Sequence, residues 1–310
     1  MQFRKDIWRP MIAEAPIEQI AASGSLEGVS CRWLPAARDL AYTADPFGYW
    51  HRGCLHVFFE NFDYRTSHGT IGVHVLDDGF GVRHSRIVLR EPWHLSYPFV
   101  FAWAGDVWML PEACASGTQT LYRAEEFPDV WVPHTRIQLD AIPIDATLLQ
   151  TGETWWMFYA PMGSDRERLT HLHIASAPGP TGPWTPHPGN PVHIDPHGAR
   201  PGGTPFEQDG TVWLPVQDCR QSYGSGLRML AIQGLAEGRI FATTGPLIAA
   251  PGAAAPFVTG CHTLSGAGPV TLFDVKRQVP SLKGLAMRPL RSFRKRMGIK
   301  TDVTHSAWLM

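Results

Sequence analysis

The chain has 310 residues, of which 44% are hydrophobic and 18% are charged, and its formal net charge is -1. This length and hydrophobic content predict a folded globular protein with a large buried core. The near-zero net charge gives no long-range field for attracting a polyanion, so no nucleic-acid partner is expected.

The five cysteines are scattered along the chain without a CxxC pair or a zinc-ligand spacing. We interpret them as free thiols in a reducing compartment. The first residues lack the apolar core of a signal peptide, and no apolar run reaches the roughly eighteen residues of a membrane helix. The sequence therefore predicts a cytoplasmic location.

The N-terminal segment, residues 1–38, is predicted to be an extension that precedes the folded domain, with a short helix over Met11–Ala22. Long stretches of 3.6-residue apolar periodicity are absent from the middle of the chain, and 30 glycines and 27 prolines are spread along its length. This pattern is typical of many short strands joined by tight turns, so the fold class is predicted to be all-β.

A two-strand sequence pattern recurs five times. In each copy a polar residue opens a short apolar run, a turn containing glycine follows, and the second run is rich in aromatic and β-branched residues. The opening residues are Asp45, Tyr97, Asp145, Arg200 and His262. Their spacing of about fifty to sixty residues is the period of a propeller blade. We predict a five-bladed β-propeller over residues 39–278; a β-sandwich, which also has short strands at regular spacing, is the alternative.

The C-terminal residues 279–310 are predicted to form a basic tail. From Lys276 to Lys300 the chain has nine lysines and arginines and no acidic residue, with leucines, methionines and a phenylalanine between them. Such a segment is compatible with peripheral contact with an anionic membrane. A solvated tail whose apolar side chains pack back onto the propeller is the alternative.

Functional residues are expected to converge at one mouth of the central channel, because the first strand of every blade lines that channel. The ends of the second strands add Glu60, Glu112, Gln217, Asp218 and Asp274 to the five opening residues. Carboxylates, an arginine and a histidine close to tryptophan faces suit a polyhydroxylated ligand, so a saccharide or glycoconjugate is the expected partner.

Cleavage of a glycosidic bond requires two carboxyl groups, one protonated and one ionised. Asp45 is the candidate for the ionised group. Glu112 is the candidate for the acid, with a pKa raised by burial and by neighbouring carboxylates. Asp145 is the third catalytic candidate and would tune its neighbours or orient the sugar. For the two aspartates, capping of local backbone groups at a strand start is the alternative.

The remaining candidates are expected to bind the substrate: Glu60, Tyr97, Arg200, Gln217, Asp218, Tyr223, His262 and Asp274. Arg200 suits a bidentate grip on a carboxylate or phosphate, which makes an anionic sugar or sugar phosphate a candidate ligand. For Arg200 and His262, pairing with a carboxylate of a neighbouring blade is the alternative. No Gly-rich phosphate loop, HExxH or GxSxG motif occurs in a suitable context, so no cofactor or metal is expected. His171 and His173 are interpreted as an outward-facing pair on a strand.

The pattern of five blades, with Asp-Pro opening the first and Asp opening the third, resembles glycoside hydrolase family 43 and the related families 32, 62 and 68. A closer resemblance covers about residues 39–278 and rests on the motifs Leu95-Ser-Tyr-Pro-Phe-Val, Leu110-Pro-Glu112, Arg200-Pro-Gly-Gly203, Gln217-Asp-Cys-Arg220, Tyr223-Gly224 and Gly260-Cys-His-Thr263. These motifs resemble the propeller at the N-terminus of the plant glucosamine inositolphosphorylceramide transferases and their bacterial relatives.

The resemblance implies a role in polysaccharide or glycolipid biosynthesis. Family 43 also implies a general-acid glutamate at the opening of blade four, where this chain has Arg200. Three classes of function therefore stay open: a glycoside hydrolase, a glycosyltransferase that uses a phosphosugar donor, and a non-catalytic sugar-binding module.

Overall fold

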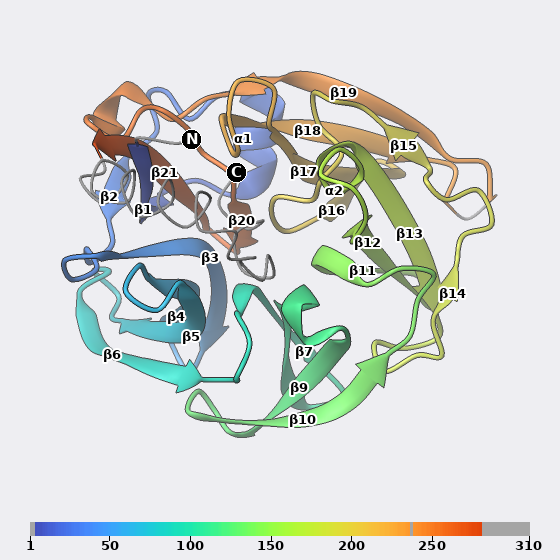
Figure 1. The fold of residues 1–310 in the computed structure, drawn as a ribbon, viewed down its shortest axis with the longest axis horizontal. Helices are drawn as coiled ribbons and strands as arrows, with labels where there is room; N and C mark the ends of the chain where they lie inside the picture. Colours follow the sequence, from blue (N-terminus) through green and yellow to red (C-terminus); the bar gives the residue numbers. More distant parts are fainter. Residues whose placement is uncertain (1–3, 236–237, 281–310) are drawn as a thin grey trace, which may run out of the picture.

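The computed structural model describes residues 4–235 and 238–280. It is a five-bladed β-propeller whose sheets follow one another around a central axis (Figure 1). The strands that contain Asp45, Tyr97 and Asp145, and those that follow Arg200 and His262, lie nearest the axis. The prediction of an all-β propeller is confirmed.

Four blades are antiparallel sheets whose strands are ordered from the axis outwards along the chain. Blade one has β3 (Ala41–His51), β4 (Cys54–Asp63), β5 (His68–Leu76) and β6 (Val82–Leu89). Blade two has β7 (Ser96–Trp103), β8 (Asp106–Glu112), β9 (Gln119–Glu126) and β10 (Val130–Ile137). Blade three has β11 (Pro143–Thr151), β12 (Thr154–Pro161), β13 (His171–Ala177), β14 (Thr185–Pro186) and β15 (His193–Ile194). Blade four has β16 (Phe206–Gln208), β17 (Thr211–Asp218), β18 (Gly226–Gln233) and β19 (Phe241–Ile248).

Blade five combines strands from both ends of the described chain: β20 (Leu264–Ala267), β21 (Val270–Pro280), β1 (Arg4–Ala13) and β2 (Cys31–Trp33). β1 pairs with β21 along all ten of its residues, and Figure 1 shows this blue strand beside the orange-red one. The prediction that residues 1–38 form an extension outside the propeller is therefore wrong. Residues 4–13 and 31–33 are part of its sheet structure.

The predicted N-terminal helix exists but begins later than expected. Helix α1 covers Ile17–Ser23, whereas Met11, Ile12 and Ala13 belong to β1. Pro16, with φ -63° and ψ 153°, precedes the helix in an extended conformation. Because a residue before proline disfavours helical geometry, the helix cannot extend back across this position. Met11, Ile12 and Ala13 instead form hydrogen bonds with the edge strand β21.

The core is divided among the interfaces between neighbouring blades. Trp108 and Trp155 pack in the cluster that joins blades one, two and three, and Trp156 packs between blades three and four. Ile17 and Ile20 of α1 fill the interface of blades four and five. These tryptophans are therefore core residues at the interfaces between blades.

The mouth face is the face on which the first strands begin and the second strands end. The hairpins that join first to second strands lie on the opposite face, and their turns have left-handed pairs such as Arg52-Gly53 (φ 49° and 77°) and Asp209-Gly210 (φ 51° and 71°). Two positive φ values in succession match the right-handed twist of paired strands. Connections from second to third strands therefore return to the mouth face.

The short elements lie in connecting segments. Helix α2 (Glu167–Thr170) and the 3₁₀ turn η1 (Cys114–Ser116) join second to third strands, and η2 (Gly252–Ala254) precedes blade five. All five cysteines are free thiols. Within the described ranges, no helix is long and apolar enough to cross a membrane. Most of the predicted basic tail, from residue 281 onwards, lies outside the described residues.

Removal of residues 1–38 should abolish cooperative folding, because it deletes β1 and β2 and exposes the edge of β21. Urea unfolding followed by circular dichroism is the measurement, with the full chain as reference. If residues 39–310 gave the same transition as the full chain, blade five would not depend on its N-terminal strands.

Candidate functional site

Three of the five opening residues share one unusual backbone conformation. Asp45, Tyr97 and Asp145 have φ values of 50°, 47° and 50°. Each lies at a register shift between the first and second strands of its blade. Left-handed geometry is costly for residues other than glycine, and a bulge changes the direction in which a side chain points. Blades one, two and three thus use the same local distortion at the mouth.

Asp45 is held by residues of blades two and five. Its Oδ2 accepts a hydrogen bond from the backbone N–H of Tyr97 (3.1 Å), and its Oδ1 accepts one from the hydroxyl of Thr263 (2.9 Å). Nε2 of His262 lies 3.5 Å from the same Oδ1. Burial raises the pKa of Asp45 to about 6, although the charge of His262 opposes this rise. Asp45 is therefore mainly ionised at pH 7 and gains a proton not far below it.

Asp274 joins blade five to blade one. Its Oδ1 accepts the backbone N–H groups of His262 (3.0 Å) and Thr263 (3.1 Å), and its Oδ2 accepts the N–H of Asp45 (3.0 Å). Nδ1 of His262 lies 2.7 Å from Oδ2. Burial lowers the pKa of His262, but the carboxylates of Asp274 and Asp45 outweigh this and leave that pKa raised. Trp8 of β1 stacks on the imidazole, with ring centroids 3.8 Å apart.

Asp45, His262 and Asp274 also form the candidate metal cluster of the described chain. One ligand atom each of Asp45, His262 and Asp274 lies within 4.8 Å of the others, a spacing that could hold a metal ion. In this arrangement, however, both oxygens of Asp274 already accept backbone N–H groups. The raised pKa of His262 favours its protonated form, which supplies positive charge beside two buried carboxyl groups.

A second group of residues connects blades three and four. Oδ2 of Asp145 accepts hydrogen bonds from Nε of Arg200 (2.6 Å) and from Nε2 of Gln217 (2.8 Å). The guanidinium of Arg200 also lies 5.3 Å from the ring centroid of Tyr223, within cation–π range. Arg200, predicted to grip a ligand anion, thus has its charge balanced by Asp145 of the protein.

Gln217 has one unsatisfied polar atom at this position. Its side-chain nitrogen donates to Asp145 and to the carbonyl of Pro201 (2.9 Å), and these two acceptors fix the orientation of the amide. Its Oε1 has no hydrogen-bond partner among the described residues, and the side chain is 1% exposed. A buried acceptor without a donor is costly, so this oxygen is available to a hydroxyl group of a ligand or to water.

Glu60 and Glu112 end the second strands of blades one and two. Burial is the main cause that raises the pKa of both, with Asp45 adding to the effect on Glu60. Oε1 of Glu60 lies 3.3 Å from Nε2 of His94. Glu112 accepts hydrogen bonds from the hydroxyl of Ser96 (3.2 Å) and the N–H of Cys114 (2.9 Å). These two glutamates retain protons more strongly than ordinary carboxyl groups.

Two predicted substrate-binding residues have polar groups that are engaged elsewhere. The hydroxyl of Tyr97 donates to the carbonyl of Gly203 (3.1 Å) and accepts its N–H (2.6 Å), which connects blade two to blade four. Asp218 is bound by Nη2 of Arg220 (2.7 Å) and Nε of Arg228 (3.0 Å). In the described structure both side chains serve to connect parts of the protein.

Tyr223 lies in the connection between β17 and β18, on the mouth face. Its ring contacts His262 edge-on, with centroids 5.4 Å apart. Lys276, which is 0% exposed, holds this connection by donating to the hydroxyl of Ser222 (3.1 Å) and to the carbonyl of Tyr223. Gly224 is required beside it, because a Cβ there would lie 2.7 Å from both His262 and Trp8.

Several residues that build this site are not predicted from the sequence. Trp8 was assigned to an extension, and only the pairing of β1 with β21 brings it to His262. His94 lies in a connecting segment without a recognisable motif. Thr263 could have been found, because it follows His262 directly in the quoted Gly260–Thr263 motif and its hydroxyl binds Asp45.

Comparison with known proteins gives one family match. The family model described as glucosamine inositolphosphorylceramide transferase 1, N-terminal, matches residues 29–244. The curated glucosamine inositolphosphorylceramide transferase 1 of Oryza sativa subsp. indica is 36% identical over 198 residues, and that of Arabidopsis thaliana is 34% identical over 204 residues. Each match covers 63% of this chain but 26% of the relative, so the chain matches about a quarter of the length of these proteins.

Solved structures share the fold at low sequence identity. The family 117 glycoside hydrolase Zg3597 of Zobellia galactanivorans has a TM-score of 0.54 and 15% identity, covering 79% of this chain and 86% of that one. The GH43_1 enzyme of Xanthomonas citri also has a TM-score of 0.54, with 13% identity, covering 84% of this chain and 92% of that one. The fold is thus related to glycoside hydrolase propellers.

Replacing Tyr97 by phenylalanine should lower the free energy of unfolding by roughly 1–3 kcal/mol, since it leaves the buried N–H and carbonyl of Gly203 without their partner. Urea unfolding measures the change. Tyr49→Phe is the control, because its hydroxyl makes no bond within the described structure. Equal stability of Tyr97→Phe and the wild type would mean that the connection between blades two and four contributes nothing.

Replacing Glu112 by glutamine should stabilise the protein at pH 8 but not at pH 4. The folded protein holds the proton of Glu112 above its ordinary pKa of 4.5, so the stability that this protonation contributes is present below pH 4.5 and is lost as the pH rises through the raised pKa. Glutamine stays uncharged and can still accept the N–H of Cys114. We expect a gain on the order of 1–3 kcal/mol at pH 8.

Urea unfolding of wild type and Glu112→Gln across this pH range is the measurement, and Glu126→Gln, an exposed glutamate at the end of β9, is the matched control. A gain that is independent of pH would show that Glu112 has no raised pKa.

Proposed function

The chain belongs to the family of the N-terminal domain of glucosamine inositolphosphorylceramide transferase 1, and on this premise we propose that its mouth binds a saccharide and cleaves a glycosidic bond. The observation that carries the proposal is the set of four buried carboxyl groups at the mouth, three of which, Asp45, Glu60 and Glu112, have raised pKa values. Asp45, Glu60, Glu112 and Asp145 come from three blades, and each is at most 6% exposed.

Asp45 and Glu112 suit the two roles of a glycosidase. Asp45, with a pKa of about 6, is the group that is ionised at neutral pH and serves as base or nucleophile. Glu112 is held by Ser96 and Cys114, and its raised pKa suits an acid that protonates the leaving oxygen.

The neighbouring polar groups suit the hydroxyl groups of a sugar. Oε1 of Gln217 lacks a donor, and a sugar hydroxyl can provide one. Asp145 is oriented by Arg200 and Gln217, and this fixes its carboxylate beside the same position. The ring of Tyr223, held by Lys276 through the backbone, adds an aromatic face next to Arg200.

Saccharide binding without turnover is the second candidate, and one observation favours it. Arg200 stands where the resemblance to family 43 leads one to expect a general-acid glutamate, and it forms an ion pair with Asp145. An arginine cannot donate a proton to a leaving group near neutral pH. If Glu112 does not replace that acid, the mouth retains its binding groups and lacks a catalyst. A transferase with a phosphosugar donor, whose phosphate leaves with little acid assistance, would use the same binding groups.

The proposal is tested by a turnover screen of the purified full chain against aryl furanosides and pyranosides, including uronic and amino sugars. Asp45→Asn and Glu112→Gln should each lower turnover by at least about a hundredfold, because each removes one partner of the acid–base pair. Turnover of the wild type should also fall below about pH 6, as Asp45 becomes protonated.

Asp140→Asn, a carboxylate that binds His173 at the rim, is the control and should retain turnover. Calorimetric binding of the same sugars separates the candidates. Binding without turnover in the wild type would favour the binding module, and turnover that survives both mouth substitutions would overturn the assignment of Asp45 and Glu112. Turnover that appears only with nucleotide- or lipid-phosphate sugars would favour the transferase.

A further inference from the structure

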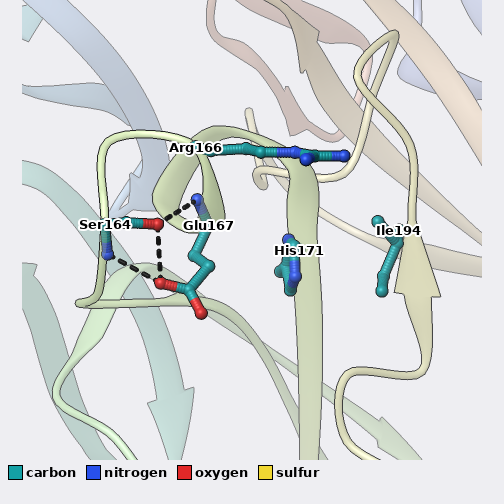
Figure 2. A pocket seen from close by; sticks show the side chains of 5 residues that line it. All are labelled: Ser164, Arg166, Glu167, His171 and Ile194. Atoms are coloured by element: carbon teal, nitrogen blue, oxygen red, sulfur yellow. Dashed lines mark hydrogen bonds between the residues drawn. The ribbon is translucent and has the colours of Figure 1, made fainter.

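A hollow of about 390 Å³ lies on the mouth face of blade three, outside the carboxyl cluster. It is lined by Ser164, Arg166, Glu167, His171 and Ile194 (Figure 2). The connection from β12 to β13, which contains α2, and the strand β15 form its walls. Because β12 ends on the mouth face and β15 pairs with the beginning of β13, both walls belong to this face.

The polar groups of the hollow are fixed in position. Oε2 of Glu167 accepts the N–H and the hydroxyl of Ser164, both at 2.7 Å, and this holds its carboxylate (Figure 2). The hydroxyl of Thr170 donates to the carbonyl of Arg166 (2.9 Å) and lies 2.9 Å from Nδ1 of His171. Since that hydroxyl has donated its proton, Nδ1–H of His171 is the donor in the second contact. In the neutral imidazole, Nε2 of His171 is then an acceptor.

The hollow still has free bonding capacity. Among residues 4–235 and 238–280, the guanidinium of Arg166 has no side-chain partner, and Oε1 of Glu167 accepts no hydrogen bond. Figure 2 shows Arg166 extended across one side of the hollow, between Glu167 and Ile194. Ile194 is 54% exposed and offers an apolar surface. Donors, acceptors and an apolar surface within one hollow are the groups that a sugar ring requires.

A short segment of the chain connects the hollow to the mouth. The segment that follows Ile194 leads in six residues to Arg200, which binds Asp145, so the two Cα atoms are at most about 20 Å apart. Asp195 anchors this segment, because its N–H donates to the carbonyl of Thr170 (3.0 Å) and its Oδ2 accepts the hydroxyl of Thr244 (2.8 Å). One glycan can therefore lie across both places.

We propose that this hollow is a second saccharide subsite, which binds an uncharged sugar unit of a glycan whose end occupies the mouth. Arg166 donates to ring hydroxyls, Glu167 and His171 accept from them, and Ile194 covers a C–H face. An uncharged unit fits because Arg166 and Glu167 balance each other. The inference rests on the proposed binding of a saccharide at the mouth.

The test measures the affinity of the full chain for a monosaccharide and for its linear oligomers by calorimetry, with xylose, arabinose and glucose series as probes. Affinity should rise roughly tenfold with length, about 1.4 kcal/mol. Arg166→Ala and Ile194→Ser should each remove that gain and leave monosaccharide affinity unchanged. Arg52→Ala, at a hairpin on the opposite face, is the matched control. Gln217→Met reports on the mouth.

The outcomes separate the two sites. If the gain with length survives both Arg166→Ala and Ile194→Ser, the hollow is not a subsite, and the proposed function of the mouth is unaffected. If oligomer binding is lost in these variants but unchanged in Gln217→Met, the hollow binds glycan and the mouth does not. If the wild type binds none of these sugars, the subsite proposal is overturned, while the proposed function is decided by the separate turnover screen.

Discussion

The carboxylate of Asp274 is the contact on which the candidate site depends most. It is 0% exposed and accepts three backbone N–H groups, from Asp45 in blade one and from His262 and Thr263 in blade five. The same group therefore joins the last blade to the first and fixes the residues that surround Asp45. The same hydrogen bonds close the propeller and position Asp45, the candidate base. A mutation that loosens blade five must therefore also displace Asp45.

The burial of these carboxyl groups lowers the stability of the folded state. Burial raises the pKa of Asp45, Glu60 and Glu112, so ionisation of any of these carboxyl groups costs free energy. Partial compensation comes from His262 and from the ion pair of Arg200 with Asp145. A purely structural interior would place apolar side chains here at lower cost. Retention of four carboxyl groups at one mouth is understandable if a ligand or a reaction needs them.

The parts of the fold that depend on local sequence were predictable. The hairpin between the first and second strands of each blade joins residues that are close in the sequence through a glycine turn. Five repeats of this sequence pattern therefore indicated five blades and their opening residues. The strands β1 and β2 were not predictable in this way, because β1 pairs with residues about 270 positions away. Its sequence, with Met11, Ile12 and Ala13 in a row, fits a short buried helix equally well until the free edge of β21 is known.

The candidate site was predictable by position but only partly by role. Asp45, Asp145, Glu112 and His262 were expected at one mouth, and the structure brings them close enough for their charges to interact. What each side chain binds depends on neighbours from other blades. Arg200 alone suggests a ligand anion, whereas its contact with Asp145 gives it an internal partner. Asp218 likewise accepts hydrogen bonds from Arg220 and Arg228, which lie on its own blade.

The contact of Tyr97 with Gly203 also limits how a polymer can approach. The phenol is 0% exposed and reaches from blade two to blade four, two blades that are not neighbours, so it lies across the space between their inner strands. Under the function proposed above, the saccharide would enter and leave the mouth from the same face. A cup of this kind suits a chain end or a short branch of that ligand better than the interior of a long polymer.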